Sequence, residues 1–181
     1  NLTSGYTLID TEDKTGTTDT LTNAVAKALT GFTAKAFSQA NIAGNGSTVI
    51  EIYYDRNINT LTYKVDGSLY DSFDIKYGAA ITPITEPTKT GYTFSGWSTI
   101  PLTMPDNDVN VTGTFTINSY TLTFIDTTGS SILRNVDWGE DLTDIPTVTP
   151  KTGYTCTWDE DNFTNITSDD TINAVCNTIN Y

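Results

Sequence analysis

Residues 88–97 read Thr-Lys-Thr-Gly-Tyr-Thr-Phe-Ser-Gly-Trp, and a close copy, Pro-Lys-Thr-Gly-Tyr-Thr-Cys-Thr-Trp, occupies residues 150–158. A fainter copy, Leu-Thr-Gly-Phe-Thr, lies at residues 29–33. The glycines of the three copies are Gly31, Gly91 and Gly153. A period of about 60 residues is the length of one small domain and indicates an array of similar modules. We therefore predict three tandem modules, residues 1–57, 58–118 and 119–181, the first of them truncated at its N-terminus.

The second and third modules share one order of predicted elements. Each opens with an alternating stretch, Thr-Leu-Thr-Tyr at residues 60–63 and Thr-Leu-Thr-Phe at residues 121–124, which is typical of a half-buried strand. A second strand follows and ends at Tyr-Gly or Trp-Gly, after which prolines interrupt any long helix. The glycine-tyrosine-threonine copy and one last strand complete the module. Each module therefore reads strand, strand, crossover, strand, strand.

The first module holds the one segment with a helical pattern. In residues 21–29, Leu21, Val25, Ala28 and Leu29 would share one helix face, with a capping residue just before them. The sequence therefore predicts a helix near residues 21–29. The resulting fold class is α+β and strand-dominated, with small modules in an elongated array.

The predicted modules follow one another without a flexible spacer. Around Asn57 and again around Asn118 the chain passes directly from one predicted strand to the next. Because no Gly/Ser-rich or Pro-rich linker separates them, we expect semi-rigid joints rather than freely moving modules.

Composition excludes several classes of partner. The chain carries 22 acidic and 9 basic residues, no histidine and a formal net charge of −13. Nucleic acid and anionic membranes both require clustered Lys and Arg, so neither is an expected partner. No apolar run in these residues is long enough for a membrane span, and none has the pattern of a positively charged leader with an apolar core. We expect no membrane insertion in this fragment, which reads as part of a longer extracellular protein.

With these motifs in place, the second and third modules resemble the internalin-B B-repeats, also called Listeria–Bacteroides repeats, of bacterial surface proteins. The residues that carry the resemblance are the opening strand, the Lys-Tyr-Gly or Asp-Trp-Gly step, and Pro-Thr-Lys-Thr-Gly-Tyr-Thr-Phe-Ser-Gly-Trp. The third module departs from the pattern at Cys156 and lacks the glycine before Trp158. The first module is similar to related modules, including those of mucin-binding proteins. The resemblance implies a β-grasp-like fold, attachment to the cell surface or cell wall, and a spacer or adhesion role.

The two cysteines give the sharpest local signal. Alignment of the modules places Cys156 opposite Phe94, and Cys176 opposite Phe115 or Thr114, on the last two strands. If those strands are neighbours, a disulfide replaces an aromatic contact. The alternative is a pair of buried free thiols, and a redox-active pair is disfavoured because no Cys-x-x-Cys spacing occurs.

Aromatic and acidic residues offer weaker candidates. Trp97, Trp138 and Trp158 could stack on sugar rings, but Trp97 and Trp158 recur at equivalent positions, which core packing also requires. Acidic turns around residues 105–108, 159–161 and 168–170 lack the spacing of a calcium loop, so we interpret them as solvated turns and predict no metal site.

The sequence contains no catalytic constellation. Histidine, a Gly-x-Ser-x-Gly elbow and a phosphate-binding glycine loop are all missing, so we predict no enzyme activity and no cofactor. The leading hypothesis is a non-catalytic stalk or adhesion segment of a bacterial surface protein. The alternative is a glycan- or mucin-binding module with exposed aromatics, whose partner would be a host or cell-wall glycan or protein.

Overall fold

The computed structural model describes residues 5–179, and all of its regular secondary structure is β-strand. The strands are β1 Phe32–Ala34, β2 Tyr54–Arg56, β3 Ile58–Val65, β4 Ser68–Lys76, β5 Tyr92–Phe94, β6 Val109–Gly113, β7 Phe115–Ile117, β8 Ser119–Ile125, β9 Ser131–Asp137, β10 Tyr154–Trp158 and β11 Asp170–Thr178. The described chain contains no helix, so the strand-dominated character predicted from the sequence is confirmed, but the class is mostly β and the predicted α+β class is wrong.

The predicted helix over residues 21–29 is an extended segment. Leu21 forms an isolated antiparallel bridge with Asn41, and exposure alternates residue by residue over residues 21–27, which is the period of a strand. Leu21 and Val25, which would have anchored the helix, are 65% and 77% exposed. A nine-residue helix is marginal by itself, and β-branched residues weaken it further. Without an apolar surface to cover, the segment pairs with the chain beside it instead.

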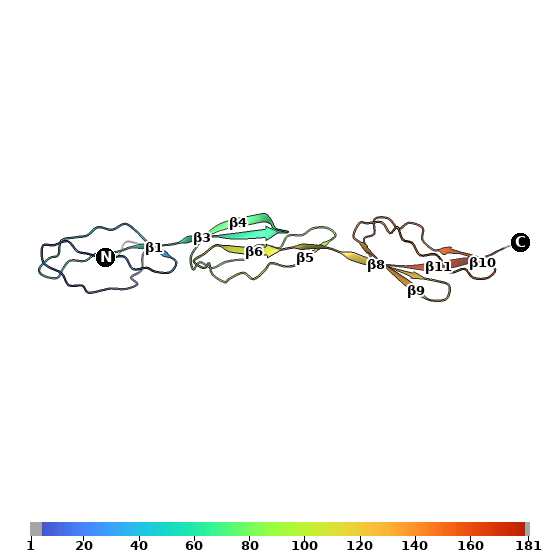
Figure 1. The fold of residues 1–181 in the computed structure, drawn as a ribbon, viewed down its shortest axis with the longest axis horizontal. Helices are drawn as coiled ribbons and strands as arrows, with labels where there is room; N and C mark the ends of the chain where they lie inside the picture. The colour runs from blue at the N-terminus through green and yellow to red at the C-terminus, as the bar shows by residue number, and fades with distance from the viewer. Residues whose placement is uncertain (1–4, 180–181) are drawn as a thin grey trace. The chain divides into compact units, whose positions relative to one another are not determined.

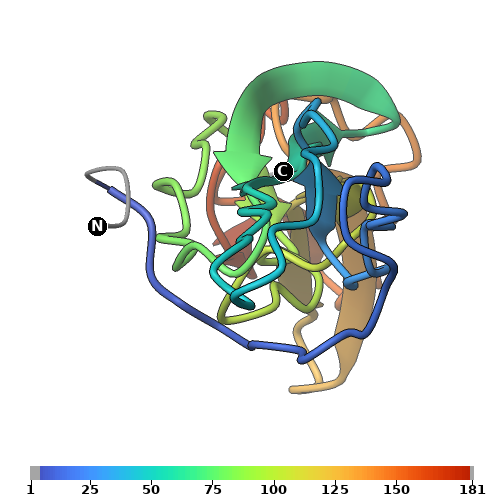
Figure 2. The ribbon, with the colours of Figure 1, turned by 90° about the vertical axis from the view of Figure 1, so that its left-hand side faces the viewer.

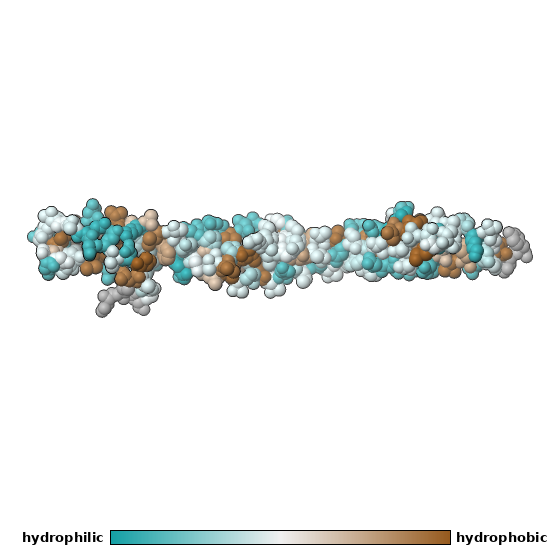
Figure 3. Space-filling view, turned by 90° about the horizontal axis from the view of Figure 1, so that it is seen from below, coloured by the Kyte–Doolittle hydropathy of each residue, from teal (hydrophilic) through white to brown (hydrophobic). Residues whose placement is uncertain are grey.

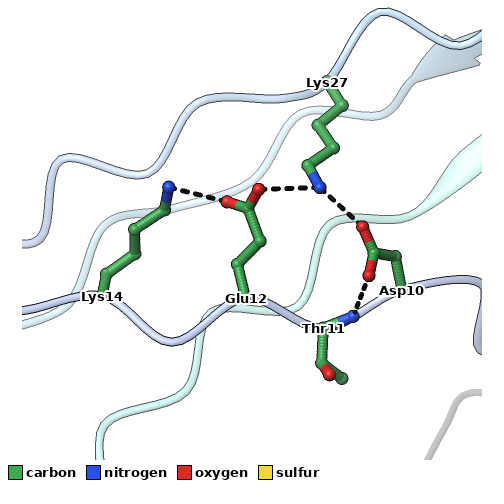
Figure 4. A network of polar contacts seen from close by, with 5 residues as sticks. All are labelled: Asp10, Thr11, Glu12, Lys14 and Lys27. Carbon is green, nitrogen blue, oxygen red and sulfur yellow. Dashed lines mark hydrogen bonds and ion pairs between the residues drawn. The ribbon is translucent and has the colours of Figure 1, made fainter.

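Side-chain contacts also hold this segment in place. The side-chain amide of Gln39 bonds both the amide and the carbonyl of Ala24 at 2.9 Å. Figure 4 shows the Lys27 ammonium between the carboxylates of Asp10 and Glu12, at 2.6 and 2.7 Å. These contacts raise the pKa of Lys27, and hydrogen bonds from Lys14 and Lys27 lower the pKa of Glu12 to about 2. The network joins two extended stretches across the surface of the first predicted module.

The chain forms two compact units. Unit 1 comprises residues 1–64, 69–83 and 99–111, and unit 2 comprises residues 65–68, 84–98 and 112–181. The sequence of the second predicted module is thus shared between the two units. The three-module division stays a prediction.

Unit 1 contains most of a three-stranded sheet in the order β4-β3-β6, together with the small β1-β2 sheet (Figure 1). β4 is an edge strand that Figure 2 shows as a curved green ribbon. The inward residues of β3 alternate, as the sequence predicts, and Leu61 and Tyr63 are buried. The other buried apolar side chains of this unit are Ile81, Met104 and Val111.

Unit 2 contains a four-stranded sheet in the order β10-β11-β8-β9 and the small β5-β7 sheet (Figure 1). β11 runs parallel to β8, whereas β9 and β10 pair antiparallel to their neighbours. The buried core of this sheet consists of Leu122, Phe124, Val136, Phe163 and Ile172. The rings of Trp158 and Phe163 both contact Phe124, at centroid distances of 5.0 and 5.5 Å. The β-grasp-like likeness stays a prediction.

One pair of backbone hydrogen bonds occurs three times along the chain. In each copy, the backbone amide of a residue with positive φ donates to the carbonyl of a residue far along the chain. The amide of that distant residue donates in turn to the carbonyl of the residue that follows the positive-φ residue. The three copies are Asp19/Thr20 with Ile42, Gly78/Ala79 with Met104, and Gly139/Glu140 with Ile166, with distances of 2.7–3.0 Å. These bonds define equivalent positions: Thr18, Tyr77 and Trp138 each stand directly before the positive-φ residue.

Candidate functional site

The connection at Asn57 is held by hydrogen bonds on three sides. The amide N–H of Asn57 donates to the carbonyl of Gly31 at 2.8 Å, and its own carbonyl accepts from the amide of Tyr77 at 2.8 Å. Its side-chain oxygen accepts from the hydroxyl of Thr33 at 2.7 Å. Asn57 therefore ties the β1-β2 hairpin to the end of β4 within unit 1.

The connection at Asn118 repeats this arrangement within unit 2. The amide of Asn118 donates to the carbonyl of Gly91 at 2.9 Å, and its carbonyl accepts from the amide of Trp138 at 2.8 Å. The side-chain oxygen of Asn118 accepts from the hydroxyl of Thr93 at 2.7 Å. The same three bonds thus connect the β5-β7 sheet to the end of β9.

At both connections an aromatic ring covers the glycine. A Cβ at Gly31 would lie 2.1 Å from the ring of Tyr77, and a Cβ at Gly91 would lie 2.1 Å from the ring of Trp138. Both glycines also have positive φ, +78° and +76°, which L side chains rarely adopt. We call Gly31, Asn57 and Tyr77 joint 1, and Gly91, Asn118 and Trp138 joint 2. In each joint, only glycine leaves room for the ring.

Joint 1 has an additional carboxylate. Asp106 accepts from the amide of Gly31 at 2.8 Å and from the side-chain amide of Asn57 at 2.7 Å. The third predicted module has a turn that is one residue shorter than the turn containing Asp106. Its carboxylate Asp169 accepts a hydrogen bond from the amide of Thr121, which is the role of Asp108 toward the amide of Thr60. The carboxylate clamp is therefore specific to joint 1.

The three tryptophans proposed as ligand-binding residues are all half-buried. Trp97 packs edge-on against Phe94, with a centroid distance of 5.0 Å, and Trp138 covers Gly91. The indole N–H of Trp158 donates to the carbonyl of Pro146 at 2.6 Å while its ring contacts the core. The structure brings none of them together in one row. Their part in ligand binding stays a prediction.

The cysteines lie in the position of an aromatic pair. Cys156 of β10 stands directly opposite Cys176 of β11, and a disulfide bond joins them. The equivalent partners in the β5-β7 sheet are Phe94 and Phe115, whose rings lie 5.2 Å apart. Thr114, the other residue considered from the sequence, is not the partner of Phe94. A covalent bond thus joins β10 and β11 where an aromatic contact joins β5 and β7.

The acidic turns use their carboxylates to organise the backbone. Asp108, Asp159 and Asp169 each accept a hydrogen bond from a backbone amide at 2.7–2.8 Å. Burial and the carboxylates of Asp170 and Asp159 raise the pKa of Glu160. Among the described residues, no group of three potential metal ligands is gathered closely enough to hold an ion.

Surface depressions in unit 2 are polar and open. One of about 370 Å³ is lined by Thr121, Thr123, Asp169, Asp170 and Thr171. A second of about 380 Å³ lies beside β9, where Arg134 pairs with Asp144 at 3.1 Å. Ligand pockets are usually enclosed and mostly apolar, which neither depression is. In residues 5–179 there is also no helix with the length and hydropathy to cross a lipid bilayer.

The described chain is built from β-strands and contains two joints of the same construction, and comparison with known proteins specifies the type of one part of it. Residues 60–117 match the model of the Listeria-Bacteroides repeat domain. The chain therefore carries a Listeria-Bacteroides repeat module, as predicted from the sequence.

Part of the chain is similar in sequence to internalin H of Listeria monocytogenes serovar 1/2a (strain ATCC BAA-679 / EGD-e). The two sequences are 35% identical over an alignment 108 residues long, and the match covers 54% of this chain and 19% of internalin H. The chain thus spans about a fifth of the length of that relative.

Sequence reasoning missed the joint residues as a set. It identified Asn57 and Asn118 as points where one strand leads into the next, and it aligned the aromatic-glycine steps that contain Tyr77 and Trp138. It did not place either aromatic on the glycine of the preceding module. The available signal was that Gly31 and Gly91 are each followed, one module later, by an aromatic-glycine pair.

Proposed function

We propose that this chain is a non-catalytic repeat segment of an internalin-like bacterial surface protein and acts as a stalk or spacer. The observation that carries the proposal is the shared construction of joints 1 and 2, in which the same three hydrogen bonds and a ring over a glycine recur. The match to the Listeria-Bacteroides repeat domain and the likeness to internalin H support a surface protein built from repeats. On this proposal, the segment sits outside the cell in a longer repeat protein, on the surface or attached to the cell wall.

The joints have the properties that a spacer requires. Bending at a connection needs free backbone dihedrals, and at Asn57 and Asn118 the amide, the carbonyl and the side-chain oxygen are all bonded. The ring above each glycine adds close packing, which resists deformation because interiors of native density have little free volume. A chain with such joints holds its modules at a defined spacing without a dedicated linker.

Small-angle X-ray scattering of the full chain, fitted with an ensemble of conformations, gives the distribution of end-to-end distances and tests the proposal. We expect this distribution to be narrow for the wild type and broader when Gly31→Ala and Gly91→Ala disturb both joints. The control is Gly129→Ala, which alters a turn glycine of similar φ that has nothing within 4 Å. A wild-type distribution as broad as that of the double variant would contradict a spacer role.

A second candidate function is adhesion through exposed aromatics, with a host or cell-wall glycan or protein as partner. The observation in its favour is on β4, where Tyr70 and Phe73 are 49% and 39% exposed. In Figure 3 apolar side chains otherwise occur in small patches among polar ones. A glycan array probed with the wild type and with Tyr70→Ala/Phe73→Ala tests this function. Binding that is equal in both proteins, or absent from both, would count against these aromatics.

A further inference from the structure

Gly153 is the third glycine of the repeated motif, and its environment differs from that of the first two. Its φ is +81°, close to the values at Gly31 and Gly91, and its carbonyl accepts the amide of Ile179 at 3.1 Å. This bond is the equivalent of the bonds from Asn57 and Asn118 in joints 1 and 2. No described atom, however, lies within 4 Å of a Cβ built at Gly153. The third copy therefore has the glycine and the backbone hydrogen bond of a joint, but no described ring packs against the glycine.

We propose that the open face of Gly153 binds the aromatic side chain of a further module of the same kind, placed by an aromatic-glycine pair such as Tyr77-Gly78 or Trp138-Gly139. This inference rests on the proposed function, because it treats the joint as the unit of assembly. The occupant is argued from the two joints within this chain, where a ring lies against the same glycine. The flanks of the site are also repeated: the Lys151 ammonium lies 4.6 Å from the ring of Tyr154, as Lys89 lies 3.6 Å from Tyr92.

The first module of a second, identical chain does not fit this site. The repeated backbone bonds align Thr18 with Tyr77 and Trp138, so the first module presents a threonine where the ring is needed. Thr18 has neither the flat surface nor the reach of an aromatic side chain. The partner is therefore a module of the second or third type, and end-to-end addition of identical chains is not expected.

The third site also differs from joints 1 and 2 in one side chain. Ile179 stands where the other joints have Asn57 and Asn118, so it offers no side-chain oxygen to the hydroxyl of Thr155. The glycine-ring contact then carries a larger part of the docking. We accordingly expect docking to be sensitive to any side chain at residue 153.

The test adds one module to the full chain. Asn180 and Tyr181 align in sequence with Ser119 and Tyr120, so a second copy of residues 121–181 is appended after Tyr181, which preserves the period. Gly153→Ala is then introduced into both the 181-residue chain and the extended chain, and thermal unfolding is followed for each. The backbone cost of alanine at positive φ is common to both lengths. The difference between the two lengths therefore isolates the contact with the appended module.

We expect Gly153→Ala to lower the midpoint of the extended chain by about 2–4 °C more than that of the 181-residue chain. Trp138→Ala in the appended copy should abolish this difference, and the appended indole should be shielded from a soluble quencher only when residue 153 is glycine. Equal effects of Gly153→Ala in both lengths would overturn the inference. If the wild type has a narrow distance distribution but Gly153→Ala lowers the midpoint equally in both lengths, this inference alone is refuted. A broad wild-type distribution would refute the spacer function itself.

Discussion

The ring of Trp138 lies so close to Gly91 that a Cβ on the glycine would be 2.1 Å from a ring carbon. The two residues are 47 positions apart in the sequence: Gly91 directly precedes β5, and Trp138 directly follows β9. Asn118, bonded to the backbone of both, fixes the contact. The same relationship links Gly31 and Tyr77 in unit 1. A strand-to-strand connection thereby becomes a packed joint.

Replacement of Gly91 by alanine should destabilise unit 2. The new methyl group must displace the Trp138 ring, and overpacking of this kind costs about 1–3 kcal/mol beyond the penalty of alanine at positive φ. Urea unfolding followed by tryptophan fluorescence measures the loss. Gly153→Ala in the same chain is the matched control, because it has the same backbone conformation with open space around it. Equal losses in the two variants would show that the ring does not restrict residue 91.

Loss of the Cys156–Cys176 disulfide should destabilise unit 2 by about 3 kcal/mol, since the bond closes a loop with a sequence separation of 20. Cys156→Ser/Cys176→Ser, compared with the wild type in urea, measures this effect, and intact mass after alkylation shows whether thiols are free. Reductant should affect the wild type and leave the double serine variant unchanged. Free thiols in protein purified without reductant would contradict the disulfide.

A second double variant separates covalent closure from packing. Cys156→Phe/Cys176→Phe recreates the cross-strand pair that Phe94 and Phe115 form between β5 and β7. Aromatic cross-strand pairs contribute about 0.2–1 kcal/mol, so this variant should recover only part of the lost stability. Full recovery would mean that side-chain packing, rather than the covalent link, stabilises this hairpin.

Acid should weaken unit 2 through Asp126. Its carboxylate accepts hydrogen bonds from the hydroxyl and amide of Thr128, from the hydroxyl of Thr149 and from the amide of Ser130, and these bonds lower its pKa. Because the folded-state pKa lies below the ordinary value of about 3.9, the stabilisation is complete above that value. It is lost as the pH falls through the folded-state pKa.

Comparison of the wild type with Asp126→Asn across pH 2–7 checks this dependence. The wild type should be the more stable protein near neutral pH, and the difference should shrink below about pH 4. Asp161→Asn, which alters an exposed carboxylate of the same unit, is the control. A difference that is independent of pH would contradict a role for the charged form.

Removal of the Asp106 carboxylate should weaken joint 1 and leave joint 2 intact. Asp106→Ala takes away the acceptor of two hydrogen bonds, and because the carboxylate is exposed we expect a loss of only about 1 kcal/mol. Amide hydrogen exchange at Gly31 and Gly91 measures the two joints separately. The control is Asp13→Ala, another exposed carboxylate in unit 1. Faster exchange at both glycines alike would contradict a clamp specific to joint 1.

Much of the fold was determined by local sequence. Alternation in residues 60–63 and 121–124 predicted β3 and β8, because the pleat sends successive side chains to opposite faces. The recurring glycines predicted the strands β5 and β10, and module alignment brought Cys156 and Cys176 to facing positions. These features depend on backbone preferences and on a repeat that is visible in one chain.

Tertiary structure alone decided the conformation of residues 21–29 and the contacts in joints 1 and 2. Residues 21–29 have a helical apolar pattern, but a helix gains its stability from a surface to cover, and here backbone pairing near Asn41 takes its place. Tyr77 and Trp138 could have been ordinary strand residues, since period and composition do not say what an aromatic ring contacts. Their position over Gly31 and Gly91 depends on where the chain turns after Asn57 and Asn118, which is set by hydrogen bonds between residues far apart in sequence.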